Sequence, residues 1–165
     1  MTIDPVEFEQ HYYRVAYLFS RFTVPYLRNI YHAYDGDMLL TLVLGEIGTR
    51  NVGRFFDTSE DFLVSENLLD DVTEHQRVLR PCNALSISDA TGIPRETVRR
   101  KVNLLIKKGW VYQNEKGHLY LTPEIAKYSE RFIFASIEAM LPCAQALAEV
   151  LSKFPAPNPN DGKPR

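Results

Sequence analysis

Basic side chains are concentrated in one short segment of the chain, residues 95–108. This segment carries six Lys or Arg residues and one acid, Glu96, so its net charge is +5, whereas the whole chain of 165 residues has a formal net charge of −2. An Arg side chain can pair with O6 and N7 of guanine, and an Asn side chain with N6 and N7 of adenine. Thr and Lys side chains suit phosphate oxygens, which position a protein on a duplex without reading its sequence. The segment therefore predicts a surface that binds nucleic acid.

Apolar residues in the same segment recur at the spacing of a helix over about 95–108. They predict a buried inner face made of Val98, Val102, Leu105 and Ile106. Pro94 suits the start of this helix, because no backbone donor is needed there. With the apolar face turned inward, the residues that point most directly outward are Glu96, Arg100, Asn103 and Lys107, with Arg95 and Arg99 beside them.

A shorter helix and a tight turn precede the basic helix. The short helix has an apolar face with Ile87 and Ala90, and a small residue, Ser88, where two helices can cross closely. Gly92 supplies the positive φ angle that the turn needs, and Ile93 is placed to fill the corner. This order of helix, glycine turn and second helix predicts a helix-turn-helix.

Two short strand patterns follow the basic helix. Gly109 is typical of a helix end, because glycine readily adopts the left-handed conformation. Residues 110–114 and 118–122 have strand patterns, and the Glu-Lys-Gly sequence at 115–117 signals a hairpin between them. We interpret the hairpin over residues 110–122 as a wing. Its polar side chains are placed to touch the sugar-phosphate backbone or the minor groove of DNA.

The residues that we expect to contact DNA lie on both helices and on the hairpin. Because the first turns of a recognition helix enter the groove, residues 95, 96, 99 and 100 are expected to lie nearest the bases. The full predicted set is Ser86, Ser88, Arg95, Glu96, Thr97, Arg99, Arg100, Asn103, Lys107, Asn114, Lys116 and His118.

Long amphipathic helices are predicted on both sides of this region. In residues 1–34, intervals of four and three residues separate the apolar side chains Phe8, Tyr12, Val15, Phe19, Phe22 and Tyr26. Pro25 should break or kink this helix near residues 23–24. Asp37 is placed to cap a helix over about 38–50. A last helix, residues 123–154, should kink at Pro142. A second subunit would most simply bury the exposed apolar stripes of the terminal helices.

An acidic stretch separates the helix over 38–50 from the helix-turn-helix. Residues 57–74 carry seven Asp or Glu residues and no Lys or Arg. We interpret residues 53–80 as a solvated insertion that is partly helical around 63–79. It lies within a DNA-binding domain over residues 35–122. The tail, residues 155–165, is rich in Pro, Asn and Gly, which predicts disorder.

Other chemistry is only weakly indicated. A pocket for a small effector would use aromatic residues of the N-terminal helix, although a core or a subunit seam is the simpler interpretation. The candidate ligand-binding residues are Tyr12, Tyr17, Phe22 and Tyr26. The four His residues lack metal-ligand spacing, and no pattern of nucleophile and base indicates an enzyme, so we expect no catalytic residue, metal or cofactor. Cys82 and Cys143 lie far apart, and we treat Cys82 as an ordinary thiol.

The helix-turn-helix and hairpin resemble the MarR (multiple antibiotic resistance regulator) type of winged-helix regulator, through TGIPRETVRRKVNLLIKKGWV and the hairpin end LYLTPE. The resemblance covers residues 85–124 and, more loosely, the flanking helices. The positions that match the family's motif are Thr97, Arg100, Gly109 and Leu121-Thr122. The resemblance implies a homodimer held by the N- and C-terminal helices and, in many members, release of DNA when a small molecule binds. The short wing, which lacks the family's Asp/Arg pair, and the acidic insertion both depart from the family's pattern.

The sequence thus predicts a mainly α fold, a winged helix-turn-helix with long N- and C-terminal dimerisation helices. The expected function is sequence-specific binding of double-stranded DNA by a homodimeric transcriptional regulator in the cytoplasm. No association with a membrane is expected, because the longest apolar run, residues 38–44, is too short to span a bilayer. The alternatives are a winged helix that binds another protein and a sensor of a small ligand without specific DNA binding.

Overall fold

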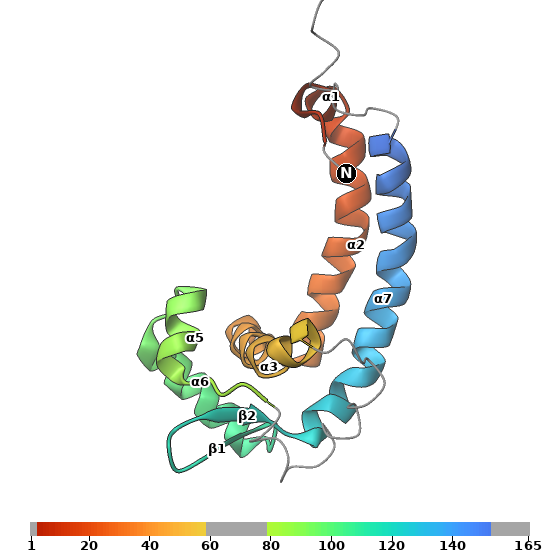
Figure 1. Cartoon of the computed structure of the whole chain (residues 1–165). Helices are drawn as coiled ribbons and strands as arrows, with labels where there is room; N and C mark the ends of the chain where they lie inside the picture. Colours follow the sequence, from red (N-terminus) through yellow and green to blue (C-terminus); the bar gives the residue numbers. More distant parts are fainter. Residues whose placement is uncertain (1–2, 59–78, 153–165) are drawn as a thin grey trace, which may run out of the picture. The chain divides into compact units, whose positions relative to one another are not determined.

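The structure is a computed structural model that describes residues 3–58 and 79–152 (Figure 1). Its fold is mainly helical with one small antiparallel sheet, which confirms the predicted mainly α class. Most of the acidic insertion and the predicted disordered tail lie outside the described residues. The elements are α1 (Pro5–Gln10), α2 (Tyr12–Ala33), α3 (Met38–Thr58), α5 (Ala84–Thr91), α6 (Arg95–Lys107), β1 (Val111–Gln113), β2 (Leu119–Leu121) and α7 (Pro123–Ser152).

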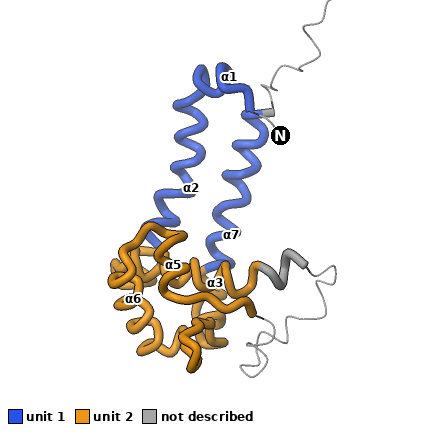
Figure 2. Tube along the Cα trace, turned by 60° about the vertical axis from the view of Figure 1, so that its left-hand side comes forward, with its two compact units in different colours: residues 1–29, 133–165 blue, residues 30–132 orange. Residues whose placement is uncertain are grey.

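Two compact units make up the chain (Figure 2). Unit 1 comprises residues 1–29 and 133–165. Its described part holds α1, most of α2 and the C-terminal part of α7, and the two long helices lie side by side in Figures 1 and 2. Unit 2 comprises residues 30–132 and holds α3, α5, α6 and the hairpin, together with the end of α2 and the start of α7.

The core of unit 2 lies between α3, α5, α6 and the hairpin. Val43 and Ile47 of α3 are fully buried, because they lie one turn apart on the same side of the helix. The hairpin adds Val111 and Leu119, and α5 adds Ile87. Ala90 is exposed, so the prediction that it shares the inner face of α5 is wrong. The short α5 turns only a narrow stripe inward.

The inner face of α6 is buried as the helical spacing predicts. Val98, Val102 and Leu105 are at most 4% exposed, whereas Ile106 at the edge of the face is half-buried. The helix begins after Pro94, whose φ of −53° is already close to helical. It ends before Gly109, whose φ of +72° turns the chain into β1.

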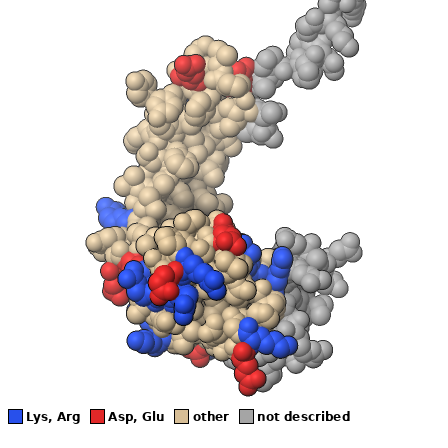
Figure 3. Space-filling model, turned by 90° about the vertical axis from the view of Figure 1, so that its left-hand side faces the viewer, with Lys and Arg blue, Asp and Glu red and all other residues tan. Residues whose placement is uncertain are grey.

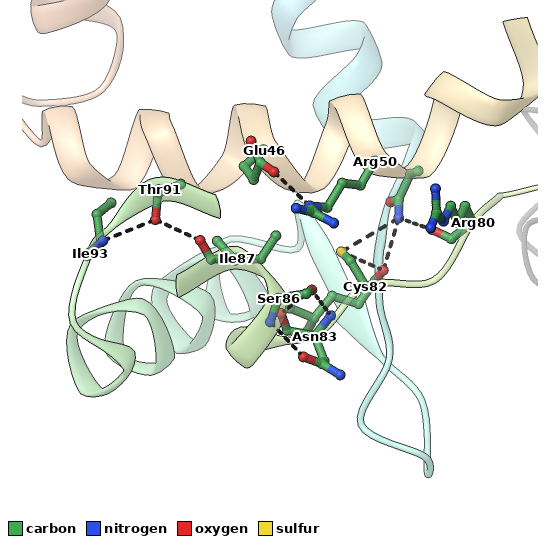
Figure 4. Close-up of polar contacts among 11 residues, drawn as sticks. Glu46, Arg50, Arg80, Cys82, Asn83, Ser86, Ile87, Thr91 and Ile93 are labelled. Carbon is green, nitrogen blue, oxygen red and sulfur yellow. Dashed lines mark hydrogen bonds and ion pairs between the residues drawn. The ribbon is translucent and has the colours of Figure 1, made fainter. Parts of the chain in front are cut away.

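The connection from α5 to α6 is held by hydrogen bonds within the turn (Figure 4). Asn83 caps α5 by accepting the backbone N–H of Ser86, and the Ser86 hydroxyl accepts the backbone N–H of Asn83 in return. Thr91 donates its hydroxyl to the Ile87 carbonyl at 2.7 Å. Gly92 adopts a φ of +69°, as the turn requires, and Ile93 fills the corner with 8% of its surface exposed. These contacts stabilise the start of α5 and the turn that leads to α6.

The buried carboxamide of Asn51, on α3, holds the hairpin to the core. Its Nδ2 donates to the carbonyls of Leu119 at 3.1 Å and Arg80 at 2.9 Å, and its Oδ1 accepts the N–H of Leu121 at 2.9 Å. Alternate residues of β2 direct their backbone groups away from β1. The Asn51 side chain therefore pairs with the outer edge of β2 as a neighbouring strand would. Cys82 continues this edge, because its carbonyl accepts the N–H of Leu119 at 2.8 Å.

The long helices differ from expectation in their boundaries. Pro25 was predicted to break or kink the helix near residues 23–24. α2 runs without interruption from Tyr12 to Ala33, so a break there is wrong. Pro25 removes one backbone donor, but the remaining backbone hydrogen bonds keep the 22-residue helix continuous. The chain breaks instead at His11, between α1 and α2. α3 continues to Thr58, beyond the predicted end at residue 50, and α7 passes through Pro142.

Candidate nucleic-acid interface

An open groove of about 580 Å³ lies between α6, the start of α5 and the hairpin. Its cationic side chains are Arg95 and Arg99 of α6 and Lys116 at the hairpin turn. Carboxamides from three different elements complete its polar lining: Asn83, Asn103 and Gln113. No Asp or Glu is among the residues that line the groove. Donors of this kind suit the oxygens of a phosphodiester chain.

The cations of the groove are accessible to a ligand. Arg99 lies 3.4 Å from Glu96, but the two side chains are 63% and 85% exposed, so water screens the pair strongly. Arg95 and Lys116 are exposed. Figure 3 shows Lys and Arg side chains gathered on unit 2, with Asp and Glu side chains between them. The groove is thus a local site of positive charge rather than part of a uniformly basic face.

The hairpin turn positions Lys116. The Asn114 carboxamide accepts the backbone N–H groups of Lys116 and His118, both at 3.0 Å, and Gly117 adopts a φ of +78°. Asn114 was predicted to contact DNA, but its Oδ1 shapes the turn. His118 lines a second groove, of about 610 Å³, on another side of the hairpin, together with Tyr112 and Tyr120.

The other predicted residues fall into two groups. Arg100, Lys107 and Glu96 are exposed on α6 but do not line the groove, and Thr97 is half-buried. Both predicted serines bond to their own chain: Ser86 donates its hydroxyl to the Asn83 carbonyl, and Ser88 donates to the Ile93 carbonyl at 2.7 Å. The serine hydroxyls therefore stabilise the start of α5 and the turn between α5 and α6.

Asn83 lines the groove but was not among the residues predicted to contact DNA. An Asn directly before a helix of small and apolar residues is the usual signal of an N-cap, and the start of α5 forms one wall of the groove. The same signal would have shown that the side chain at this position lies next to the exposed N–H groups of a helix start.

Two of the six basic residues of segment 95–108 are directed toward acids of the loop between α2 and α3. Lys101 Nζ lies 2.6 Å from Asp37 Oδ2, and their side chains are only 14% and 27% exposed. Lys108 Nζ lies 3.8 Å from Asp35 and 4.9 Å from the centre of the Trp110 ring. The outward charge of α6 is therefore smaller than its sequence suggests, and Lys101 holds α6 against the start of α3.

We expect Lys101→Met to lower the free energy of unfolding by about 2 kcal/mol, because it removes a charge-assisted hydrogen bond and leaves Asp37 partly buried. We expect the salt dependence of DNA binding to stay unchanged, since Lys101 does not face the groove. Urea titration and DNA titration at several salt concentrations measure the two effects. A salt slope that falls by about one unit would show instead that Lys101 contacts a phosphate.

Lowering the pH provides a second test of the Lys101–Asp37 pair. Burial alone would raise the pKa of Asp37, but the hydrogen bonds from Lys101 and from the backbone of Leu40, with the charges of Lys101 and Arg100, lower it below its ordinary value of 3.8. A carboxyl group whose pKa is lowered in the folded state stabilises the protein at pH values above its unfolded-state pKa. This stabilisation is lost as the pH falls. The difference in melting temperature between wild type and Lys101→Met should therefore shrink below about pH 4.

The four residues proposed for an effector differ in their exposure and contacts. Tyr12 and Tyr17 are 51% and 65% exposed, and Tyr12 contacts Phe8 and Tyr13. Phe22 and Tyr26 are half-buried and stack with their ring centres 5.3 Å apart. A small cavity in unit 1 is lined by other residues: Ile3, Asp4, Phe8, His11, Val15, Val150 and Leu151.

Cys82 is a buried thiol beside the hairpin, and burial raises its pKa to about 11. Its Sγ lies 3.7 Å from the Leu119 carbonyl oxygen. Since the thiolate is the reactive form, we expect Cys82 of the folded protein to resist alkylation at pH 7.5 and to react after denaturation. Mass spectrometry of each cysteine-containing peptide gives the measurement. Rapid labelling of Cys82 in the folded protein would contradict this expectation.

Two further findings bear on function. Among the described residues, no group of three or more His, Cys, Asp or Glu side chains is arranged to hold a metal ion. Residues Pro123–Leu151 of α7 form the one described helix whose length and composition would allow it to cross a membrane. This is weak evidence, because a helix that pairs with another subunit has the same properties.

Comparison of the chain with protein-family models, curated proteins and solved structures finds no match.

Proposed function

We propose that residues 83–122 form a winged helix-turn-helix that binds double-stranded DNA, with α6 as the recognition helix and the hairpin as the wing. The observation that supports this most directly is the groove between α6 and the hairpin, where Arg95, Arg99 and Lys116 converge without a lining carboxylate. One phosphodiester strand would lie along this groove.

The dimensions of α6 fit the role of a recognition helix. Its 13 residues extend over about 20 Å, and the major groove of B-form DNA, about 12 Å wide, accepts one helix. Val98, Val102 and Leu105 fix which side of α6 faces the protein. The exposed side then offers Arg100 to the base edges, while the groove cations contact the backbone.

Sequence-specific binding by a regulator would use two copies of the recognition helix. A homodimer presents two α6 helices related by a two-fold axis, so each copy reads one half of a nearly palindromic site. The half-sites would be about one helical turn of DNA apart. We therefore propose a homodimeric transcriptional regulator.

Salt dependence of binding tests the proposal against the alternative of a protein-interaction module. If the three groove cations of each subunit neutralise phosphates, a dimer releases about six counterions, and the slope of log affinity against log salt is about −5. Fluorescence anisotropy with a labelled duplex at several salt concentrations measures this slope. Affinity for duplex DNA that is absent even at low salt would reject the proposal.

A further inference from the structure

Glu96 is the one acidic residue of α6, the helix that the proposed function places in the major groove of DNA. Its side chain is 85% exposed, and it lies 3.4 Å from Arg99 in a pair that water screens strongly. A carboxylate at this place repels phosphates, because like charges repel. Binding that depended on charge alone would therefore be weakened by Glu96.

The buried side of α6 fixes the direction in which Glu96 points. At about 100° per residue, Glu96 lies close to the side opposite the buried residues, and Arg100 lies on the same side one turn later. Arg95 and Arg99 line the groove beside this row, whereas Glu96 and Arg100 are not among the groove residues. With one phosphodiester strand in the groove, the row of Glu96 and Arg100 faces the base edges.

The chemistry of a carboxylate restricts the base that Glu96 can contact. An ionised carboxylate only accepts hydrogen bonds, so its partner has to be a donor. The donors in the major groove are N4 of cytosine and N6 of adenine. Adenine presents the acceptor N7 beside its N6 group, which would repel a carboxylate oxygen, whereas cytosine presents no acceptor of its own on this edge. Cytosine is therefore the better partner.

Arg100 gives a second, complementary contact on the same side of α6. Its guanidinium group can pair with O6 and N7 of guanine. The four residues from Glu96 to Arg100 span about 6 Å along the helix, which is close to two base-pair steps of about 3.4 Å each. The cytosine and the guanine are thus expected within about two base pairs of each other.

We infer that Glu96 is a specificity-determining residue that selects a cytosine in each half of the DNA site, an inference that rests on the proposed function. Where cytosine is present, its N4 amino group donates to the Glu96 carboxylate. Guanine and thymine offer no donor on this edge, so the carboxylate then lies near the phosphates without a partner. Glu96 weakens binding to unrelated DNA in this way, and specificity is the difference between the two affinities.

Selection from a random duplex library by the wild type and by Glu96→Gln tests this inference. A carboxamide pairs with N6 and N7 of adenine. We expect the wild type to enrich cytosine at one position of each half-site, and Glu96→Gln to enrich adenine at that position with the other positions unchanged. In fluorescence anisotropy, two duplexes that differ only at this base pair should differ in affinity about 10-fold for the wild type, in favour of cytosine. Glu96→Gln should lose this preference and bind an unrelated duplex about 3-fold more tightly.

Glu124→Gln is the matched control. Glu124 is the second residue of α7, as Glu96 is the second residue of α6, and both are exposed. An acid in the first turn stabilises a helix through the helix dipole, so both variants lose that contribution. Glu124 does not line the groove, and we expect Glu124→Gln to keep the base preference of the wild type. Urea titration measures the stability of each variant, which a purely helix-stabilising role would change without changing the preferred base.

The outcomes separate this inference from the DNA-binding proposal. If the wild type enriches a motif and Glu96→Gln enriches the same base at every position, the inference is overturned and the proposed function stands. The inference also fails if the position that responds to Glu96→Gln holds an A·T pair in the wild-type motif. A wild type that binds no duplex DNA even at low salt would overturn both.

Discussion

Replacing Asn51 by leucine is expected to lower the free energy of unfolding by about 3–5 kcal/mol. The substitution leaves the Leu121 N–H and the carbonyls of Leu119 and Arg80 without their partner at a fully buried position. Each buried polar group that loses its hydrogen bond costs about 1–3 kcal/mol. Urea titration followed by circular dichroism measures the loss.

Two companion variants show whether hydrogen bonding is the cause. Asn51→Asp keeps an acceptor for the Leu121 N–H but sets a carboxylate against two carbonyl oxygens, so we expect it also to destabilise the protein strongly. Thr49→Ala changes an exposed side chain on the same helix and should alter stability by less than about 0.5 kcal/mol. If Asn51→Leu costs less than about 1 kcal/mol, then the carboxamide does not hold β2 as described.

Replacing Arg99 by glutamate is expected to weaken binding of duplex DNA at least about 30-fold at moderate salt. The variant loses one phosphate contact per subunit and sets a carboxylate against the DNA backbone. Because the Arg99 side chain is 63% exposed, the free energy of unfolding should change little. Fluorescence anisotropy measures the affinity, and urea titration measures the stability.

Lys127→Glu is the matched control for this substitution. It makes the same change in net charge at an exposed position of α7, away from the groove lining. We expect a much smaller loss of affinity, because charges beyond about 10 Å are screened in physiological salt. Equal losses in the two variants would indicate that total charge, rather than the groove, determines DNA binding.

Local patterns predicted α5, α6 and the glycines next to them well. Gly92 and Gly109 have positive φ, and Val98, Val102 and Leu105 are buried, because neighbours close in sequence determine turns and helix faces. The directions of the basic side chains could not be predicted in this way. Lys101 and Arg99 are two residues apart, yet Lys101 pairs with Asp37, which is 64 residues away. A helical pattern shows which residues are polar, but only tertiary packing shows which acid each one meets.

Long-range contacts also explain why Asn51 was not predicted as a structural residue. Its partners Leu119 and Leu121 lie 68 and 70 residues further along the chain, and no local pattern marks a buried polar side chain. On α2, the sequence indicated one apolar stripe, but Phe19 of that stripe is 58% exposed, and a second stripe runs through Tyr17 and Val24. An aromatic-rich helix carries apolar residues on most of its sides, so spacing alone does not select the buried one.

Selection of genomic DNA fragments would show whether this protein binds duplex DNA at a specific sequence. The purified protein is mixed with random duplex fragments at low and moderate salt, and the retained fragments are sequenced. A dimeric regulator should enrich a nearly palindromic motif that persists at moderate salt, with half-sites about one helical turn apart. Retention that disappears with salt and enriches no sequence, or no retention at all, would contradict sequence-specific binding by a dimeric regulator.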